Sequence, residues 1–241
     1  MSFGVVFPGQ GSQRVGMLEE AAGAFSVVSD TFSEASEALG YDLWQLVWQG
    51  PAEKLGLTEY TQPAILTASV ALFRAFTEAN AFQPTAGAGH SLGEYSALVS
   101  AGTLSLADGV RLVRKRGAAM QDAVPVGVGA MAVVMGLADD VVTGTCNSVS
   151  TADSFVGGVN FNAPEQVVIA GHSAAVDAAI TALRDAGARR AMPLPVSAPF
   201  HTPLMQPAAE VMQQAFEDVS WSTPQFLSLI HISEPTRPYL I

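Results

Sequence analysis

The chain has 241 residues, of which 49% are hydrophobic and 14% are charged, a composition typical of a globular protein. Its formal net charge of −11 argues against a nucleic-acid or anionic-membrane surface, because the long-range field would repel both. A single cysteine, Cys146, excludes an internal disulfide, and neither a secretory leader nor an apolar stretch of membrane-spanning length is present, so we expect a cytoplasmic protein.

Short apolar runs separated by helical periodicity fill the first half of the chain, the pattern of an α/β domain. The last helical segment is expected to be entered at Pro63 and carries a wide apolar face suited to a sheet. The expected elements are a strand over 3–7, helices to about residue 80, a strand over 85–89, and helices over 94–100 and 106–121.

After a linker over 125–129 the pattern changes to strand, helix, strand, strand, helix, strand, the order of a ferredoxin-like unit. These elements are expected at 130–136, 138–148, 156–160, 166–170, 174–186 and 190–195. We therefore predict an α/β fold with an α/β-hydrolase-like large domain, residues 1–125 and 196–226, into which a ferredoxin-like small domain, residues 126–195, is inserted.

Residues 227–241 depart from the amphipathic pattern that precedes them. Their sequence looks like a translated sequencing-library adapter rather than evolved protein, so we expect a non-native tail. An ordinary strand and loop is the alternative, which composition alone does not reject.

The segment Gly89-His90-Ser91-Leu92-Gly93 lies between a predicted strand and a predicted helix. A nucleophilic serine needs exposure, a base, and donors directed at the developing oxyanion, and flanking glycines permit the tight turn that lifts Ser91 above a sheet. The amide of Leu92 is one candidate oxyanion donor. The amide of Gln10, in the loop after the first strand, is the second, unless that loop is a phosphate cradle or a plain turn.

One of the four histidines is favoured as the base. His231 lies in the suspect tail, His172 in a turn of the small domain, and His90 directly before the serine, where a strand-like backbone points it elsewhere. His201 follows the serine in chain order, as in α/β-hydrolases, and lies in a proline-framed loop. A structural histidine is the alternative.

Arg116 falls in the middle of the apolar stripe of its predicted helix, whereas Arg114 and Lys115 point away. A buried charge is costly without an anion, so Arg116 needs either an internal carboxylate or one brought by a substrate, which a guanidinium binds as a bidentate fork. Arg114 and Lys115 form either a patch that steers an acidic partner or a solvated helix face.

Taken together, these motifs closely resemble the malonyl-CoA:acyl-carrier-protein transacylases of fatty-acid synthesis. In chain order they are Gly9-Gln10-Gly11-Ser12-Gln13, Gln62-Pro63-Ala64, Gly89-His90-Ser91-Leu92-Gly93-Glu94, Arg116, Asn160-x-Asn162 and Pro199-Phe200-His201. The resemblance covers residues 1 to about 226. The family continues for several tens of residues beyond, including a strand and a hydrogen-bond acceptor for the catalytic histidine, so the third triad member is not named here.

The resemblance implies a ping-pong transfer in which Ser91 takes malonyl from malonyl-CoA and gives it to the phosphopantetheine thiol of acyl carrier protein. It assigns His201 as the base and the amides of Gln10 and Leu92 as oxyanion donors. The implied substrate-binding residues are Arg116 for the malonyl carboxylate, Phe200 as a ring that excludes an α-methyl branch, Gln62 and Asn160. We expect a monomer without a metal or a tightly bound cofactor.

Other functions are compatible with the same motifs. A serine esterase or thioesterase would use the elbow with water as acceptor, and it predicts an acidic triad residue between Ser91 and His201 and no core-facing arginine. An inactive truncated fragment would only dock carrier protein. An acyltransferase module cut from a polyketide synthase is a further possibility, although the start at Met1 favours a free-standing enzyme.

Overall fold

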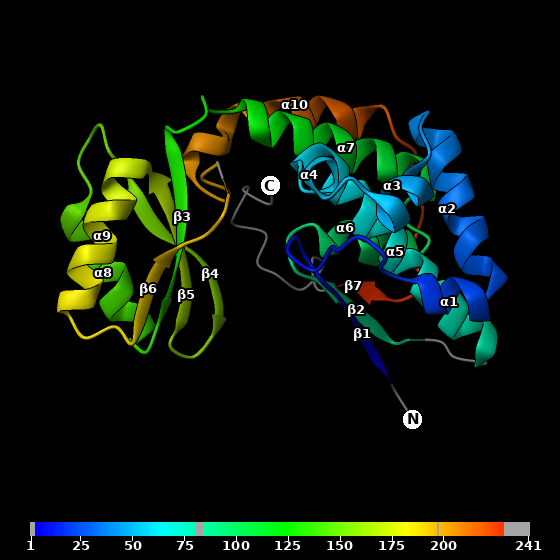
Figure 1. The fold of residues 1–241 in the computed structure, drawn as a ribbon, viewed down its shortest axis with the longest axis horizontal. Helices are drawn as coiled ribbons and strands as arrows, with labels where there is room; N and C mark the ends of the chain where they lie inside the picture. The colour runs from blue at the N-terminus through cyan, green and yellow to red at the C-terminus, as the bar shows by residue number, and fades with distance from the viewer. Residues whose placement is uncertain (1–2, 81–83, 197, 229–241) are drawn as a thin grey trace. The chain divides into compact units, whose positions relative to one another are not determined.

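A computed structural model describes residues 3–80, 84–196 and 198–228, which divide into two compact units (Figure 1). The first unit combines Met1–Ala118 with Val211–Leu240, and the second is formed by Ala119–Glu210. Helices α7 (Leu106–Asp122) and α10 (Gln206–Glu217) each run from one unit into the other. The expected domain boundaries at residues 126 and 195 fall inside the second unit. The predicted boundaries mark where the chain leaves and re-enters the large domain, whereas the two units are defined by the compactness of their contacts. The domain boundaries therefore stay a prediction.

In the described part of the chain, the sheet of the first unit has the parallel order β1-β2-β7, formed by Gly4–Phe7, Ala86–Gly89 and Leu227–Ser228. Helix α6 (Gly93–Ser100) packs on this sheet (Figure 1). Strand β7 consists of the first two residues of the predicted non-native tail, which pair with Ala86 and Gly87. The rest of that tail lies outside the described residues.

Five helices precede β2 where the sequence showed continuous helical periodicity. They are α1 (Glu19–Ala24), α2 (Ser26–Leu39), α3 (Leu43–Gln49), α4 (Ala52–Leu55) and α5 (Thr58–Ala79). Gly40 and Gly50 end α2 and α3 with φ values of 75° and 81°, a region that glycine enters at little steric cost. The prediction that the last helix is entered at Pro63 was wrong. Proline in the second turn gives up one backbone hydrogen bond, and the helix continues through it from Thr58.

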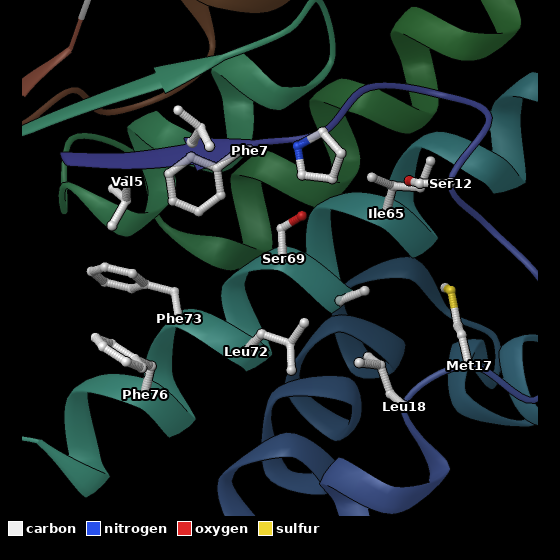
Figure 2. A pocket seen from close by; sticks show the side chains of 13 residues that line it. Val5, Phe7, Ser12, Met17, Leu18, Ile65, Ser69, Leu72, Phe73 and Phe76 are labelled. Atoms are coloured by element: carbon white, nitrogen blue, oxygen red, sulfur yellow. The ribbon is translucent and has the colours of Figure 1, made fainter.

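An apolar pocket of about 430 Å³ lies between β1 and α5 (Figure 2). Phe73 packs on β1, where its ring lies 6.2 Å from that of Phe7 in an edge-on arrangement. Phe73 also lines the pocket, together with Leu72 and Phe76, which are 46% and 50% exposed, and Val6 on β1 is 83% exposed. The apolar face of α5 is therefore only partly covered by the described residues.

The second unit has the ferredoxin-like architecture predicted from the sequence. Its elements are β3 (Gly129–Met135), α8 (Asp139–Val149), β4 (Val156–Ala163), β5 (Gln166–His172), α9 (Ser173–Asp185) and β6 (Arg190–Pro193). The antiparallel sheet has the order β4-β5-β3-β6, and α8 and α9 cover one of its faces (Figure 1). Strand β3 starts one residue earlier than expected, at the end of the predicted linker.

Both faces of the inner strand β5 are buried, each by its own apolar cluster. On β5, Ile169 joins the cluster beneath the two helices with Cys146, while the neighbouring Val168 joins a second cluster with Phe200. Successive side chains of a strand point to opposite faces, so a strand with two buried faces must be apolar throughout. This explains why the sequence of β5 is a continuous apolar run rather than an alternating one.

Candidate active site

Ser91 lies between β2 and α6 with φ at 54°, in the left-handed region that non-glycine residues rarely adopt. For an L-residue this conformation costs roughly 1 kcal/mol or more, and it persists only where neighbouring structure imposes it. Strand, sharp turn and helix follow one another as the nucleophile elbow requires. The local structure predicted around Ser91 is thus confirmed, while the role of its hydroxyl stays a prediction.

The two glycines of the elbow are required by close backbone contacts. A Cβ atom on Gly89 would lie 1.9 Å from the carbonyl carbon of Gly93, and one on Gly93 would lie 2.2 Å from the carbonyl oxygen of Phe7. Real Cβ atoms essentially never approach backbone so closely. The start of α6 is therefore pressed against the ends of β1 and β2, and this packing holds Ser91 in its strained turn.

The two candidate oxyanion donors follow adjacent parallel strands. Leu92 is the residue directly before α6, and Gln10 lies in the loop after β1, whose Phe7 is paired with Gly89. Within the described residues, neither the Leu92 nor the Gln10 amide donates a hydrogen bond. Amides at the carboxyl ends of neighbouring parallel strands and at a helix start suit the binding of a developing oxyanion.

A hydrogen-bonded chain of side chains joins three predicted site residues to Ser91. Arg116 donates from Nη2 to Ser91 Oγ at 3.2 Å and from Nη1 to Gln62 Oε1 at 3.0 Å. Gln62 in turn donates from Nε2 to Gln10 Oε1 at 3.1 Å. The side chains of Gln10, Gln62, Ser91 and Arg116 thus form one network in the first unit, although 54 residues separate Gln62 from Arg116.

Arg116 is only 2% exposed, as the sequence pattern predicted. Burial lowers the pKa of its guanidinium from the ordinary value, because desolvation disfavours the charged form. Neither ion pair of the described residues, Arg74 with Glu34 and Arg111 with Asp108, includes it, and its Nε has no hydrogen-bond partner there. An internal carboxylate partner, one of the two alternatives left open by the sequence, therefore finds no support in the described residues.

His201 lies in the second unit, in a loop with φ at 61°. The loop is fixed by Pro199, whose ring occupies the space that a Cβ on Gly129 would fill, and by a 2.6 Å hydrogen bond from Thr202 Oγ1 to the Pro199 carbonyl. A strained residue in a rigid loop is typical of functional positions. The role of His201 as base stays a prediction.

Among the other histidines, His172 has a structural role, since its Nδ1 accepts a 2.9 Å hydrogen bond from the Phe155 amide. His90 is exposed beside the loop after β1. His231 lies outside the described residues.

Phe200 and Asn160, predicted to contact substrate, also belong to the second unit. Phe200 is 8% exposed and packs in the cluster with Met131 and Val168, which accounts for a bulky ring there on structural grounds alone. Asn160 is half-buried on β4, opposite Val168, next to an irregularity in the strand register. Their substrate contacts stay predictions.

Tyr95 is a site residue that the sequence reasoning missed. Its ring lies in α6, four residues after Ser91, and the Cζ of Arg116 is 5.6 Å from the ring centroid. Ser91 precedes α6 in a left-handed turn, so helical spacing from the serine gives no signal for Tyr95, and only the tertiary contact with Arg116 identifies it.

The basic residues on the outer side of α7 are partly used within the fold. Arg111 Nε donates to the Ala38 carbonyl at 3.1 Å, and Arg114 Nη1 donates to the Leu39 carbonyl at 3.2 Å. Both carbonyls belong to the last turn of α2, whose terminal acceptors lack partners within their own helix. Lys115 is exposed.

Neither metal ligands nor membrane spans are found among the residues that the structure describes. They contain no group of three or more histidine, cysteine, aspartate or glutamate side chains that could hold a metal ion. In the same residues, every helix is too short or too polar to cross a membrane.

Comparison with known proteins decides the family. The family model described as the acyl transferase domain matches residues 5–237. The chain belongs to the acyltransferase family. This acyltransferase is 54% identical over 222 residues to the malonyl CoA-acyl carrier protein transacylase of Escherichia coli, covering 92% of the chain and 72% of that protein. It is 41% identical to the Staphylococcus aureus protein of the same name, covering 92% of the chain and 71% of the relative.

Solved structures of similar proteins agree with the fold of the acyltransferase. The malonyl CoA-acyl carrier protein transacylase of Coxiella burnetii superposes with a TM-score of 0.93 at 47% identity, covering 95% of this chain and 72% of that one. A malonyl-transacylase solved in complex with a type II polyketide synthase acyl-carrier protein gives a TM-score of 0.92 at 51% identity, covering 95% and 74%. The expected α/β-hydrolase-like large domain with a ferredoxin-like small domain is confirmed by these matches.

Proposed function

We propose that this acyltransferase transfers a malonyl group from malonyl-CoA to the phosphopantetheine thiol of acyl carrier protein through a malonyl ester on Ser91. The observation that supports this most is the position of Arg116. Its guanidinium is buried without an ion pair among the described residues and donates to Ser91 Oγ at 3.2 Å. A cation held beside the nucleophile selects an acyl group that carries a free carboxylate.

The first half-reaction acylates the serine. His201 takes the proton from Ser91 Oγ as the oxygen attacks the thioester carbonyl, and the amides of Gln10 and Leu92 stabilise the oxyanion of the tetrahedral intermediate. When the carbon–sulfur bond breaks, the coenzyme A thiolate leaves and takes that proton from His201. The second half-reaction repeats these steps in reverse, with the carrier-protein thiol as nucleophile and Ser91 Oγ as leaving group.

The proposed substrate-binding residues either select the acyl group or position it. Arg116 binds the malonyl carboxylate as a fork, and Gln62 holds the guanidinium through a 3.0 Å hydrogen bond while it contacts the substrate. Phe200 limits branching at the carbon next to the thioester, and Asn160 binds the acyl donor. We further propose that the protein acts as a cytoplasmic monomer, with no metal or tightly bound cofactor and no nucleic-acid or membrane partner.

Intact-mass measurement after incubation with malonyl-CoA tests the covalent step. The wild-type chain should gain one malonyl group, Ser91→Ala should gain none, and His201→Ala should gain it far more slowly. Addition of holo acyl carrier protein should then return the wild-type chain to its starting mass and malonylate the carrier. A wild-type chain that gains no malonyl group would overturn the proposal in favour of an inactive protein that only docks its carrier.

The same samples distinguish transfer from hydrolysis. An esterase or thioesterase releases free malonate at full rate without carrier protein, whereas a transferase retains the acyl group until a thiol acceptor arrives. The network around Ser91 favours transfer, because a hydrolase has no use for a buried arginine beside its nucleophile. Complete loss of the malonyl group in the absence of carrier protein would contradict this.

A further inference from the structure

The guanidinium of Arg116 lies near the ring of Tyr95 in the interior of the first unit. Its Cζ is 5.6 Å from the ring centroid, and the two residues are 2% and 6% exposed. A guanidinium within about 6 Å of an aromatic centroid is attracted by the ring quadrupole, and the attraction is strongest where water is excluded. Tyr95 is therefore an electron-rich neighbour of a buried charge.

The hydrogen bonds of Arg116 leave its charge incompletely balanced. Nη1 and Nη2 donate to neutral oxygens, Gln62 Oε1 and Ser91 Oγ, while Nε has no partner among the described residues. Two single hydrogen bonds to neutral oxygens restrain the guanidinium less than a bidentate ion pair would, and its plane has to be set to receive a carboxylate as a fork. The adjacent ring supplies a third, rigid restraint.

Tyr95 is held in place by its own surroundings. Its ring stacks on that of Phe216, with centroids 6.4 Å apart and planes inclined by 26°, and Phe216 contacts Trp221 edge-on at 5.9 Å. Tyr95 also lies four residues after Ser91, at the start of α6. Arg116 also donates to Ser91 Oγ at 3.2 Å, so the contact between the ring and the guanidinium links Tyr95 to the position of the nucleophile.

The hydroxyl of Tyr95 takes no part in this arrangement. It is buried, and no described residue accepts or donates a hydrogen bond to it. Burial raises the pKa of the phenol, so the group stays neutral and offers Arg116 no anionic partner. The contact with Arg116 therefore depends on the ring alone.

We propose that Tyr95 is a positioning residue. Its ring holds the Arg116 guanidinium ready for the free carboxylate of the acyl donor, and the Tyr95 hydroxyl is dispensable. The proposal rests on the proposed function, because it assumes that Arg116 binds this carboxylate. It assigns to Tyr95 a role in acyl selectivity, exerted through Arg116 rather than by contact with substrate.

Binding measured by calorimetry in a Ser91→Ala background tests this without turnover. The dissociation constants of malonyl-CoA and acetyl-CoA are compared, since only the malonyl group carries a free carboxylate. Tyr95→Phe should keep the malonyl preference, whereas Tyr95→Leu should lower it about tenfold with little change in acetyl-CoA binding. Equal weakening of both ligands in the leucine variant would mean that Tyr95 is merely structural.

A second series keeps the test valid if the leucine variant does not fold. Phenylalanine with increasing fluorine substitution, placed at position 95, preserves ring shape while it progressively removes the negative charge of the ring face. The malonyl preference should fall steadily along the series, and an unchanged preference would overturn the proposal. Tyr60→Leu is the matched control, because Lys54 lies 4.8 Å from that ring centroid and neither residue belongs to the Ser91 network.

Arg116→Ala separates this proposal from the function on which it rests. If that variant binds both acyl donors as the parent chain does, the carboxylate clamp itself is wrong. If Arg116→Ala loses the malonyl preference while the fluorinated variants at position 95 all keep it, only the role of Tyr95 is wrong.

Discussion

The side chain of Arg116 donates a 3.2 Å hydrogen bond to Ser91 Oγ, so the proposed nucleophile and the proposed carboxylate clamp are in direct contact. A neutral hydroxyl is a weaker acceptor for a guanidinium than a carboxylate. A carboxylated acyl donor is therefore expected to displace this contact at Nη2, which frees Ser91 Oγ for attack. The proposed function thus predicts that acyl selection and activation of Ser91 are coupled through Arg116.

Arg116→Ala should lower malonyl transfer at least about a hundredfold in kcat/KM while acetyl transfer falls much less, because a buried charge-assisted pair is lost only with malonyl. The measurement is transfer from each acyl-CoA to carrier protein. Arg114→Ala, two residues away in α7 and bonded to the Leu39 carbonyl, serves as control and should leave the malonyl to acetyl ratio unchanged. A parallel decline of both activities in Arg116→Ala would refute the clamp.

Gln62→Glu should abolish the malonyl preference, although the two side chains have nearly the same size and shape. The new carboxylate would replace an oxygen that already accepts from Arg116 Nη1 at 3.0 Å, forming an internal ion pair that competes with the substrate. We expect a rise of about tenfold or more in KM for malonyl-CoA, together with some loss of stability, because a carboxylate cannot donate to Gln10 Oε1 as Gln62 Nε2 does. Gln213→Glu on the exposed face of α10 makes the same charge change and should alter neither value. An unaffected KM in Gln62→Glu would remove Gln62 from the clamp.

Gly89→Ala should destabilise the first unit by more than about 3 kcal/mol, because the added Cβ would lie 1.9 Å from the Gly93 carbonyl carbon. Chemical denaturation followed by tryptophan fluorescence measures the change. Gly23→Ala in α1 is the matched substitution, since a Cβ there meets nothing within 4 Å, and it should stabilise the fold by about 0.5–1 kcal/mol. Comparable stability of the two variants would contradict the close packing described for the elbow.

Lys115→Glu should raise the Michaelis constant for acyl carrier protein but not that for malonyl-CoA, if the outer face of α7 steers an acidic carrier. Lys115 is the appropriate residue to change, because Arg111 and Arg114 bond to the end of α2 and their removal would also lower stability. The effect should shrink at high salt. Identical constants at low salt would show that this face is only solvated.

Cys146 should stay unreactive in the folded protein. It is fully buried, and burial raises the pKa of its thiol from 9.0 to about 11. Since the folded pKa exceeds the unfolded one, the group favours the folded state below pH 9 and loses that contribution as pH rises from 9 to 11. A disulfide reagent should label the thiol only as fast as the second unit unfolds, and rapid labelling at pH 8 would contradict the burial.

Much of the fold follows from local patterns. The predicted strands and helices of the ferredoxin-like unit match the structure within a few residues, because strand and helix periodicities are distinct there. The start of α5 was misplaced because proline is common at the first position of a helix. The helix extends upstream of Pro63 because Thr58 and Thr61 pack against their surroundings. Leu72 and Phe76 are 46% and 50% exposed at a pocket between β1 and α5, whereas Phe73 packs on Phe7, and helical periodicity does not distinguish these outcomes.

For the site, the sequence by itself determined the glycine-framed turn of Ser91 and the inward direction of Arg116, since both depend on near neighbours in the chain. Only the tertiary structure decided what Arg116 touches. Gln62 lies 54 residues away, and the absence of an ion pair among the described residues depends on every element packed around the arginine. Backbone strain and helical phase are local properties, whereas the partners of a buried charge depend on contacts between distant segments, which periodicity does not encode.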